Sequence, residues 1–236
     1  MLCAIHQPNF FPWLGYFEKI SRADAFVFLN QVDYEKSGHS MQCYTNRVAI
    51  IDANRNKTYI HCPVIREHGP QKIDTIKIKT EIDWRAVIRN VLDNAYNEAP
   101  FKSEIEELMV GILDYETEYL SEFNINAITR LCEALGITTK LYRQDQFVSE
   151  NHSTELLVEL TKNVGCDEYL YGGGGSKYQE EGIFLNAAIK AVPQDFVQWK
   201  YNQGNGEFVS GLSILDSLYW TGIDETQKMI KDYHKL

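Results

Sequence analysis

The chain has 236 residues, of which 44% are hydrophobic and 12% aromatic, so it can build one full core and we expect a single domain. A formal net charge of -10 argues against broad binding to nucleic acid or to an anionic membrane surface. No apolar run approaches the roughly 20 residues that span a bilayer, and the N-terminus lacks the basic region of a signal peptide. Five scattered cysteines indicate free thiols in a reducing cytoplasm.

The first third of the chain alternates between apolar runs and polar segments. Residues 1–5 and 25–29 are predicted as buried strands, with a helix over residues 14–23 between them. Residues 30–47 are polar and irregular, which predicts a loop. Residues 48–52 and 57–64 alternate in polarity and predict a β-hairpin across Asn54-Arg55-Asn56.

The rest of the chain is richer in helical periodicity. We predict strands at residues 73–82, 139–142, 168–171 and 195–199, the last at a sheet edge. Helices are predicted over residues 83–95, 102–119, 122–135, 153–164, 179–189, 213–220 and 224–235, with Asp83 as an N-cap. Strands that alternate with helices predict an α/β fold: a mostly parallel central sheet with flanking helices, a small inserted β-hairpin and a helical subdomain at about 83–136, all within one domain of residues 1–236.

A polar cluster follows the first predicted strand. His6, Gln7 and Asn9 stand beside Pro8 and before Pro12. Open α/β sheets bind ligands at the carboxyl ends of their strands, and histidine is the side chain most easily tuned for proton transfer near neutral pH. We therefore predict that His6 is a general acid or base, with Gln7 and Asn9 as catalytic neighbours. The simpler interpretation is a histidine that only bonds a backbone carbonyl.

An aromatic cluster comes next in the chain. It comprises Phe10, Phe11, Trp13, Tyr16 and Phe17. Packing beneath the loop explains most of these side chains, but Trp13 or Tyr16 could also stack on a sugar or a base. Gly15 allows a close backbone approach at the start of the helix, where free N–H groups favour anions.

A glycine-rich segment follows the strand predicted at 168–171. It reads Gly172-Gly173-Gly174-Gly175-Ser176-Lys177-Tyr178. Backbone amides in such a run can wrap an anion, and Lys177 adds positive charge. The segment fits neither the Walker pattern nor the dinucleotide fingerprint, so a flexible turn is the alternative. Because this segment and the His6 loop both follow strands, we predict that they share one ligand site, with residues 173–178 binding substrate.

Metal binding and cysteine chemistry are weaker alternatives. Ligand types occur at Cys3 with His6, at His39 with Cys43, and at His61 with Cys62 and His68. None of these pairs has a recognised zinc spacing, so we expect no metal site. No Cys–His arrangement for a nucleophile can be identified in the sequence either.

The chain resembles the WbqC-like family of bacterial proteins. The resemblance begins with Ile5-His6-Gln7-Pro8-Asn9-Phe10-Phe11-Pro12-Trp13-Leu14-Gly15-Tyr16-Phe17 and continues in order over nearly the whole chain. Its further segments are residues 23–29, 32–36, 46–47, 63–64, 76–78, 83–85, 172–178 and 212–216, with Gly222. The chain departs from the family at Asn30, where an acid is common, and it lacks an aromatic residue near Ser37.

The family resemblance implies that the loop after the second predicted strand contributes to substrate binding. Taken alone, this loop would be an ordinary solvated segment. With the resemblance, Lys36 and Arg47 become candidates for neutralising phosphates, and Tyr34 and Asn46 join them as substrate-binding residues.

The family resemblance implies a function in bacterial surface polysaccharide biosynthesis, such as that of O-antigen and lipopolysaccharide. The implied activity is a cytoplasmic transferase that forms an amide by moving an aminoacyl group, perhaps glycyl, onto a nucleotide-linked amino sugar. The acyl donor is open, and an aminoacyl-tRNA would be the exception to the expected lack of nucleic-acid partners. The alternatives are a non-catalytic sugar-nucleotide-binding or assembly protein of the same pathway, and a homodimer is one expected state.

The N-terminal segment is also similar to the HxGH nucleotidyltransferase and ligase superfamily. Some members adenylate a carboxylate with ATP and pass it to an amine, so an ATP-dependent ligase that forms an acyl-adenylate is an alternative mechanism. ATP is the one cofactor that this likeness suggests. The second histidine of that motif is absent, and Tyr16 stands near its place.

Overall fold

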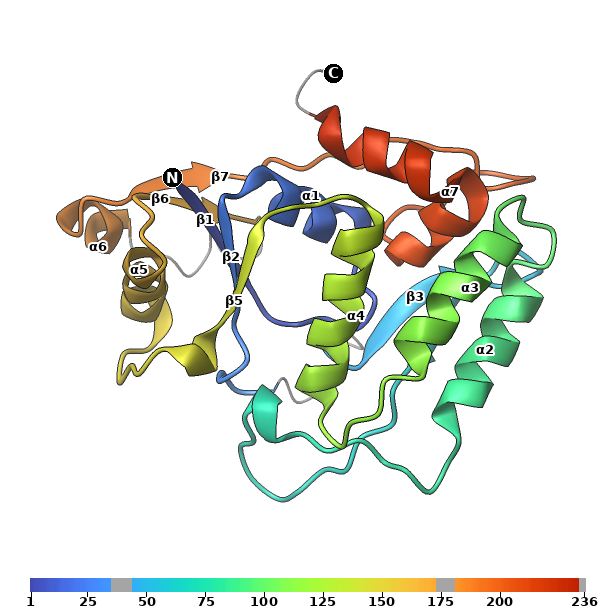
Figure 1. The fold of residues 1–236 in the computed structure, drawn as a ribbon, viewed down its shortest axis with the longest axis horizontal. Helices are drawn as coiled ribbons and strands as arrows, with labels where there is room; N and C mark the ends of the chain where they lie inside the picture. The colour runs from blue at the N-terminus through green and yellow to red at the C-terminus, as the bar shows by residue number, and fades with distance from the viewer. Residues whose placement is uncertain (35–43, 173–180, 234–236) are drawn as a thin grey trace.

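A computed structural model describes residues 1–34, 44–172 and 181–233. Its centre is a five-stranded sheet in the order β5-β2-β1-β6-β7, and each pair of neighbouring strands is parallel (Figure 1). The strands are β1 (Leu2–His6), β2 (Ala25–Phe28), β5 (Lys140–Arg143), β6 (Glu168–Tyr171) and β7 (Lys190–Pro193). The predicted α/β fold with a parallel central sheet is therefore confirmed.

Helices cover both faces of this sheet. Alternate strand side chains point to opposite faces, so Ala4 and Phe26 join the core beneath α1 (Leu14–Arg22) and α4 (Leu120–Ala134). Cys3, Val27 and Tyr169 join a second core cluster beneath α5 (Ser153–Asn163) and α6 (Glu181–Asn186). Burial on both faces explains why the central strands are continuous apolar runs in the sequence.

The order of the strands gives the sheet a switch point. From the central strand β1, the chain moves outward through β2 to β5, and it then returns to the other side of β1 for β6 and β7. This is the order of a doubly wound fold, in which ligands bind outside the carboxyl ends of the strands where the winding direction changes. We use the term switch point for the carboxyl ends of β1 and β6.

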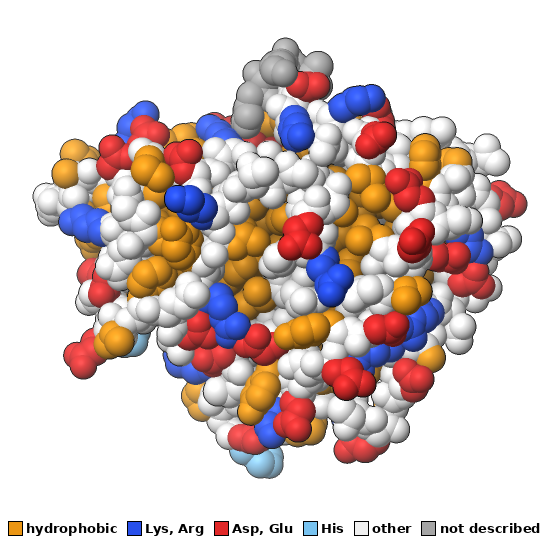
Figure 2. Space-filling view, viewed as in Figure 1, with side chains coloured by type: hydrophobic (Ala, Val, Ile, Leu, Met, Phe, Trp, Pro, Cys, Tyr) orange, Lys and Arg blue, Asp and Glu red, His pale blue; other side chains and the backbone are white. Residues whose placement is uncertain are grey.

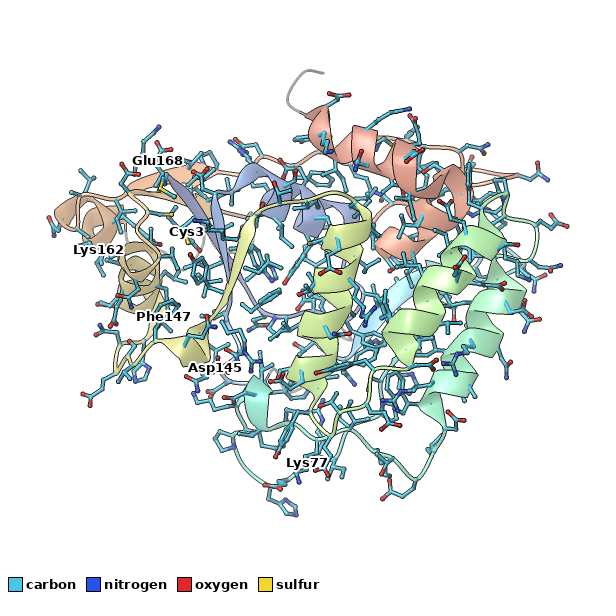
Figure 3. All side chains as sticks on the ribbon, viewed as in Figure 1. Cys3, Lys77, Asp145, Phe147, Lys162 and Glu168 are labelled. Atoms are coloured by element: carbon cyan, nitrogen blue, oxygen red, sulfur yellow. The ribbon has the colours of Figure 1, made fainter. Side chains whose placement is uncertain are left out.

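The two edges of the sheet can be followed in Figure 3. Asp145 and Phe147, which come after β5, lie at its carboxyl edge, whereas Glu168 begins β6 at its amino edge. The switch point therefore belongs to the same edge as Asp145.

A separate antiparallel hairpin consists of β3 (Arg47–Ile51) and β4 (Lys57–His61). Asp52 closes its turn by accepting hydrogen bonds from the backbone N–H groups of Asn54 (2.9 Å) and Asn56 (2.8 Å). The turn falls where the sequence predicts it, and the small inserted hairpin is confirmed.

The remaining long helices are α2 (Trp84–Ala95), α3 (Lys102–Leu113) and α7 (Ile214–Lys231). The predicted N-cap is present, since the Asp83 carboxylate accepts from the backbone N–H of Ala86 at 3.0 Å. Helix α7 is kinked at Gly222, which has a φ of 78°. Buried residues of α2, α3 and α4 belong to the same core cluster as the sheet, and a distinct helical subdomain at 83–136 stays a prediction.

Four predicted elements were wrong in position, extent or type. The edge strand is β7 at Lys190–Pro193 and not residues 195–199, since Asp195 has a φ of 49°, outside the strand region. The segment 73–82 forms a short 3-10 turn at Ile73–Thr75 and isolated bridges instead of a strand. Helix α3 ends at Leu113 and not at residue 119, and the described part of the helix predicted over 179–189 ends at Asn186.

The charge distribution on the surface and the character of the helices relate to the expected absence of nucleic-acid and membrane partners. Lysine and arginine side chains are interspersed with acidic ones on the face drawn in Figure 2, so this face shows no basic patch among the described residues. In the described part of the chain, no helix has the length and apolar character to cross a bilayer.

Candidate functional site

The predicted catalytic segment crosses the carboxyl end of β1. His6 is the last residue of β1, and residues 7–13 form a loop that leads into α1. Buried Phe10 and Phe11 hold this loop down against Phe123 of α4. The side-chain amide of Asn124 donates to the carbonyls of Pro8 at 2.8 Å and Thr45 at 2.7 Å, which fastens the loop to residues 44–46.

The His6 ring is held in one orientation. Its Nδ1 lies 3.1 Å from the Gln7 carbonyl, and the ring meets Tyr16 and Trp13 edge-on, with centroid distances of 4.9 Å and 5.8 Å. The carbonyl can only accept, so Nδ1 carries the proton and Nε2 carries the lone pair. This arrangement leaves Nε2 as the basic atom of the side chain.

The surroundings also fix the charge of His6. Burial, followed by the positive charge of Lys19, lowers the pKa of His6 from 6.5 to about 3, against the opposing effect of the Gln7 carbonyl. His6 is therefore neutral at pH 7 and can accept a proton without first losing one. A general base must be neutral before it acts, and a pKa of about 3 makes His6 a weaker base than a histidine that titrates near pH 7.

Two of the predicted site residues beside His6 are buried. Tyr16 is only 1% exposed, and its hydroxyl donates to the same Gln7 carbonyl at 2.9 Å. Asn9 is 3% exposed. The stacking role of Tyr16 and the catalytic role of Asn9 stay predictions.

Trp13 lies closer to the surface, beside an aromatic residue that the sequence did not single out. Tyr44 is 45% exposed, and its ring centroid lies 5.8 Å from that of half-buried Trp13. The backbone N–H of Phe10 donates to the Tyr44 carbonyl at 3.0 Å and fixes this pairing. His6, Trp13 and Tyr44 thus form a row of rings that ends at the surface. Only the folded chain brings Tyr44 here, since it is far from the other two in sequence.

The start of α1 is closely packed. A Cβ atom at Gly15 would lie 2.7 Å from the Phe196 ring, so the residue that approaches Gly15 is Phe196. Gln194, just after β7, donates to the carbonyl of Gly15 and to the Glu18 carboxylate, both at 2.6 Å. The close approach predicted at Gly15 therefore exists, but it is made by the protein itself.

Lys19, a buried lysine at the switch point, was not among the residues predicted from the sequence. Lys19 of α1 is 3% exposed, and its ammonium donates to the carbonyl of Ile5 at 2.9 Å. Lys19 follows Gly15 by four residues and Tyr16 by three, so helical periodicity puts it on the face that they share. That spacing is the signal that could have revealed it.

The candidates in the loop after β2 and in the hairpin have partners other than the His6 ring. The Tyr34 ring is buried against the Arg66 guanidinium, 4.7 Å away. The Asn46 side chain donates to the Cys62 carbonyl at 3.1 Å, and its role in substrate binding stays a prediction. The Arg47 guanidinium lies 4.0 Å from the Tyr59 ring centroid, and its buried Nε has no hydrogen-bond partner among the residues that the structure describes. No contact among the described residues joins Arg47 to His6, and its role in binding phosphate stays a prediction.

The remaining predicted binding residues lie outside the described residues. They are Lys36, Gly173, Gly174, Gly175, Ser176, Lys177 and Tyr178. The position of β6 is relevant to the predicted ligand site shared by the His6 loop and the glycine-rich segment. β6 pairs with β1, and Gly172 directly follows β6. Gly172, the first residue of the glycine-rich segment, therefore lies at the switch point, just after the strand that pairs with the one carrying His6.

Neither metal chemistry nor cysteine chemistry gains support from the described residues. Within residues 1–34, 44–172 and 181–233, no three His, Cys, Asp or Glu side chains are grouped as a metal site would require. Cys3, Cys62 and Cys132 are buried, and burial raises the pKa of each thiol to about 12. A thiol with such a pKa is a poor nucleophile at neutral pH.

Comparison with known proteins gives a family and a relative. The sequence profile of the WbqC-like protein family matches residues 7–228. Uncharacterized protein Rv1507c of Mycobacterium tuberculosis (strain ATCC 25618 / H37Rv) is 29% identical over 224 residues, which is 94% of each chain. No solved structure matches the chain.

Proposed function

Because the chain belongs to the WbqC-like protein family, we propose that it transfers an aminoacyl group, glycyl in the simplest case, onto the amine of a nucleotide-linked amino sugar. The product would be an amide used in building bacterial surface polysaccharides such as O-antigen. The proposed reaction takes place in the cytoplasm, where the activated sugar would be available.

The observation that carries this proposal is a neutral, oriented histidine at the switch point of a doubly wound sheet. The fold suits a nucleotide, and His6 suits the removal of a proton from a nucleophile. An amine must lose a proton as it attacks, so a base with a free lone pair at neutral pH is the group that amide formation requires. The Nδ1 contact with the Gln7 carbonyl directs that lone pair to Nε2.

The proposed step begins with the neutral sugar amine attacking the carbonyl carbon of an activated aminoacyl donor. A C–N bond forms, and His6 Nε2 takes the proton that the nitrogen releases. The tetrahedral oxyanion then collapses and breaks the bond to the leaving oxygen of the donor. Protonated His6 returns its proton to that oxygen, which restores the neutral base. An aminoacyl-tRNA and an aminoacyl adenylate made from ATP both carry such a leaving oxygen.

We propose that the row of rings formed by His6, Trp13 and Tyr44 binds the substrate. Trp13 and Tyr44 offer flat faces with polar edges at the outer end of the row, which suits a base or a sugar ring. His6 lies at the inner end, where the amine would react. Cations for the diphosphate are proposed at Arg47, Lys36 and Lys177.

The test is turnover of an amino-sugar nucleotide by His6→Ala, with His61→Ala as the matched control. His61 is an exposed histidine at the end of β4. We expect His6→Ala to lose at least 100-fold in kcat while it still binds the sugar nucleotide, and His61→Ala to behave as wild type. The aminoacyl donors to supply are glycyl-tRNA, and glycine with ATP. Release of pyrophosphate that depends on glycine would identify the adenylate route.

Binding without turnover would instead favour the sugar-nucleotide-binding or assembly protein. In that case His6→Ala would change affinity or thermal stability and nothing else. Equal turnover by wild type and His6→Ala would refute the role of His6 as a base.

A further inference from the structure

The pairing between β1 and β6 ends before the carboxyl end of either strand. The paired residues run from Leu2 with Glu168 to Ala4 with Leu170, whereas β1 continues beside β2 as far as His6. β6 likewise continues beside β7 as far as Tyr171. The backbone of β1 at Ile5 is therefore no longer paired with β6.

The Ile5 carbonyl points to the β6 side of β1. In a parallel sheet, alternate carbonyls of a strand point to the same neighbour. The Leu2 and His6 carbonyls accept from β2-side residues, namely Asp24 at 2.9 Å and Leu29 at 2.8 Å, while the Met1 carbonyl accepts from Glu168 of β6 at 3.1 Å. Ile5 has the parity of Met1, so its carbonyl lies where β6 would have continued the ladder.

The Lys19 ammonium takes the place of the missing strand. It donates to this carbonyl at 2.9 Å, and its side chain is 3% exposed. An ammonium carries three N–H donors, and Ile5 is the only acceptor for Lys19 in the described part of the chain. Buried charged donors without acceptors are strongly unfavourable. A positive charge that has two N–H donors without an acceptor among the described residues therefore lies at the switch point, bound to the residue that precedes His6.

We propose that the Lys19 ammonium is the anchor for a phosphate group of the substrate at the switch point. This inference rests on the proposed function in one respect: it assumes that the substrate binds at the switch point. Phosphate oxygens would accept hydrogen bonds from the N–H donors that have no acceptor in residues 1–34, 44–172 and 181–233, and they would neutralise the buried charge. The same chemistry is present in the diphosphate of a sugar nucleotide and in ATP.

The titratable groups around Lys19 make binding depend on pH in a recognisable way. They are Cys3 and His6 on β1 and Glu18 on α1. Burial lowers the pKa of Lys19 to about 8. The pKa of Cys3 is about 12 and that of His6 about 3, so neither of these changes charge between pH 7 and 9. Affinity for the anion would thus weaken by about tenfold from pH 7 to pH 9, although the phosphate itself becomes more negative over that range.

The experiment is calorimetric titration of inorganic pyrophosphate into wild type, Lys19→Met and Lys140→Met. Lys140 is an exposed lysine at the start of β5, at the opposite edge of the sheet, so its variant makes the same chemical change away from the site. We expect Lys140→Met to bind as wild type and Lys19→Met to lose at least tenfold in affinity while it keeps a cooperative thermal transition. Equal binding by Lys19→Met and wild type would overturn the proposal.

Two further arms keep the test decisive. If Lys19→Met does not fold, Lys19→Gln replaces it, because glutamine keeps an N–H donor and carries no charge: a loss of at least tenfold in pyrophosphate affinity supports the proposal, and binding equal to wild type refutes it. Repeating the titrations with a uridine-diphosphate amino sugar and with ATP identifies which phosphate source uses the site. Loss of pyrophosphate binding in Lys19→Met, without aminoacyl transfer by wild type, would leave the anion site standing and refute only the proposed function.

Discussion

A buried carboxylate near the start of α7 allows a sharp prediction about stability. Asp216 is 0% exposed and accepts three hydrogen bonds: from the Tyr96 hydroxyl at 3.1 Å, the Tyr201 hydroxyl at 2.7 Å and the Gln203 amide at 2.8 Å. These donors come from the end of α2 and from the segment before α7. The carboxylate therefore joins parts of the chain that are far apart in sequence.

Asp216→Ala would leave all three donors buried without this acceptor. Each unsatisfied donor costs about 1–3 kcal/mol, and removing one partner from a buried charged network typically costs about 3–5 kcal/mol in total. For a chain of this size, such a loss corresponds to a fall in Tm of about 10 °C. Asp216→Asn keeps an oxygen for Tyr201 and Gln203, and its NH2 group can donate to the Tyr96 oxygen. We expect its free energy of unfolding to lie within about 1 kcal/mol of wild type.

Comparing Asp216→Ala with Asp216→Asn also separates the contribution of the hydrogen bonds to stability from that of the negative charge. Burial raises the pKa of Asp216, against the hydrogen bonds that lower it. A carboxyl group with a raised folded-state pKa binds more protons in the folded state, so its contribution to stability is lost as pH rises through that pKa. Asp216→Asn should therefore gain stability relative to wild type as the pH is raised from 4 to 7. Urea unfolding at several pH values, followed by tryptophan fluorescence, measures this. Equal destabilisation by Asn and Ala at every pH would refute the reasoning.

Three further predictions concern single side chains. Gly222→Ala places a Cβ atom 2.7 Å from the Phe101 ring at a φ of 78°, and we expect a loss of about 2–4 kcal/mol in chemical denaturation. Phe123→Ala removes a fully buried ring that contacts Phe10 and should cost about 3–5 kcal/mol, whereas Phe123→Leu should cost less in the same assay. Because the pKa of His6 falls from 6.5 to about 3 on folding, stability should decrease as pH falls from 6.5 towards 3. His6→Gln should flatten that decrease in acid unfolding curves, and an unchanged curve would contradict it.

The sequence predicted the central part of the sheet well because its strands are buried on both faces. β1 and β2 are unbroken apolar runs with turn residues between them. The edge strand β7 was misplaced for a physical reason. Its four residues are exposed or half-buried, so they carry little apolar pattern, while Phe196 and Trp199 further along are apolar because they pack on Tyr233.

The site was predictable only where its residues are close in sequence. His6 and Trp13 come from one short segment, and the structure brings their rings together. Tyr44 and Gln194 reach the same region through tertiary contacts that leave no local signal. Lys19 differs from them, since helical spacing would have revealed it. A lysine inside an amphipathic pattern is normally assigned to the solvent face, and only the position of the Ile5 carbonyl shows otherwise.

The strand order has a consequence for how the chain folds during synthesis. β1 is made first but lies in the middle of the sheet, and its pairing runs from Leu2 with Glu168 on one side to Cys3 with Ala25 on the other. One edge of β1 therefore stays unpaired until Glu168 to Leu170 of β6, far along the chain, have left the ribosome. Contacts over such a separation slow folding, and an unpaired apolar edge invites pairing with other chains. The nascent chain should thus need protection until β6 arrives, and a circular permutant that begins with β6 should refold faster and aggregate less.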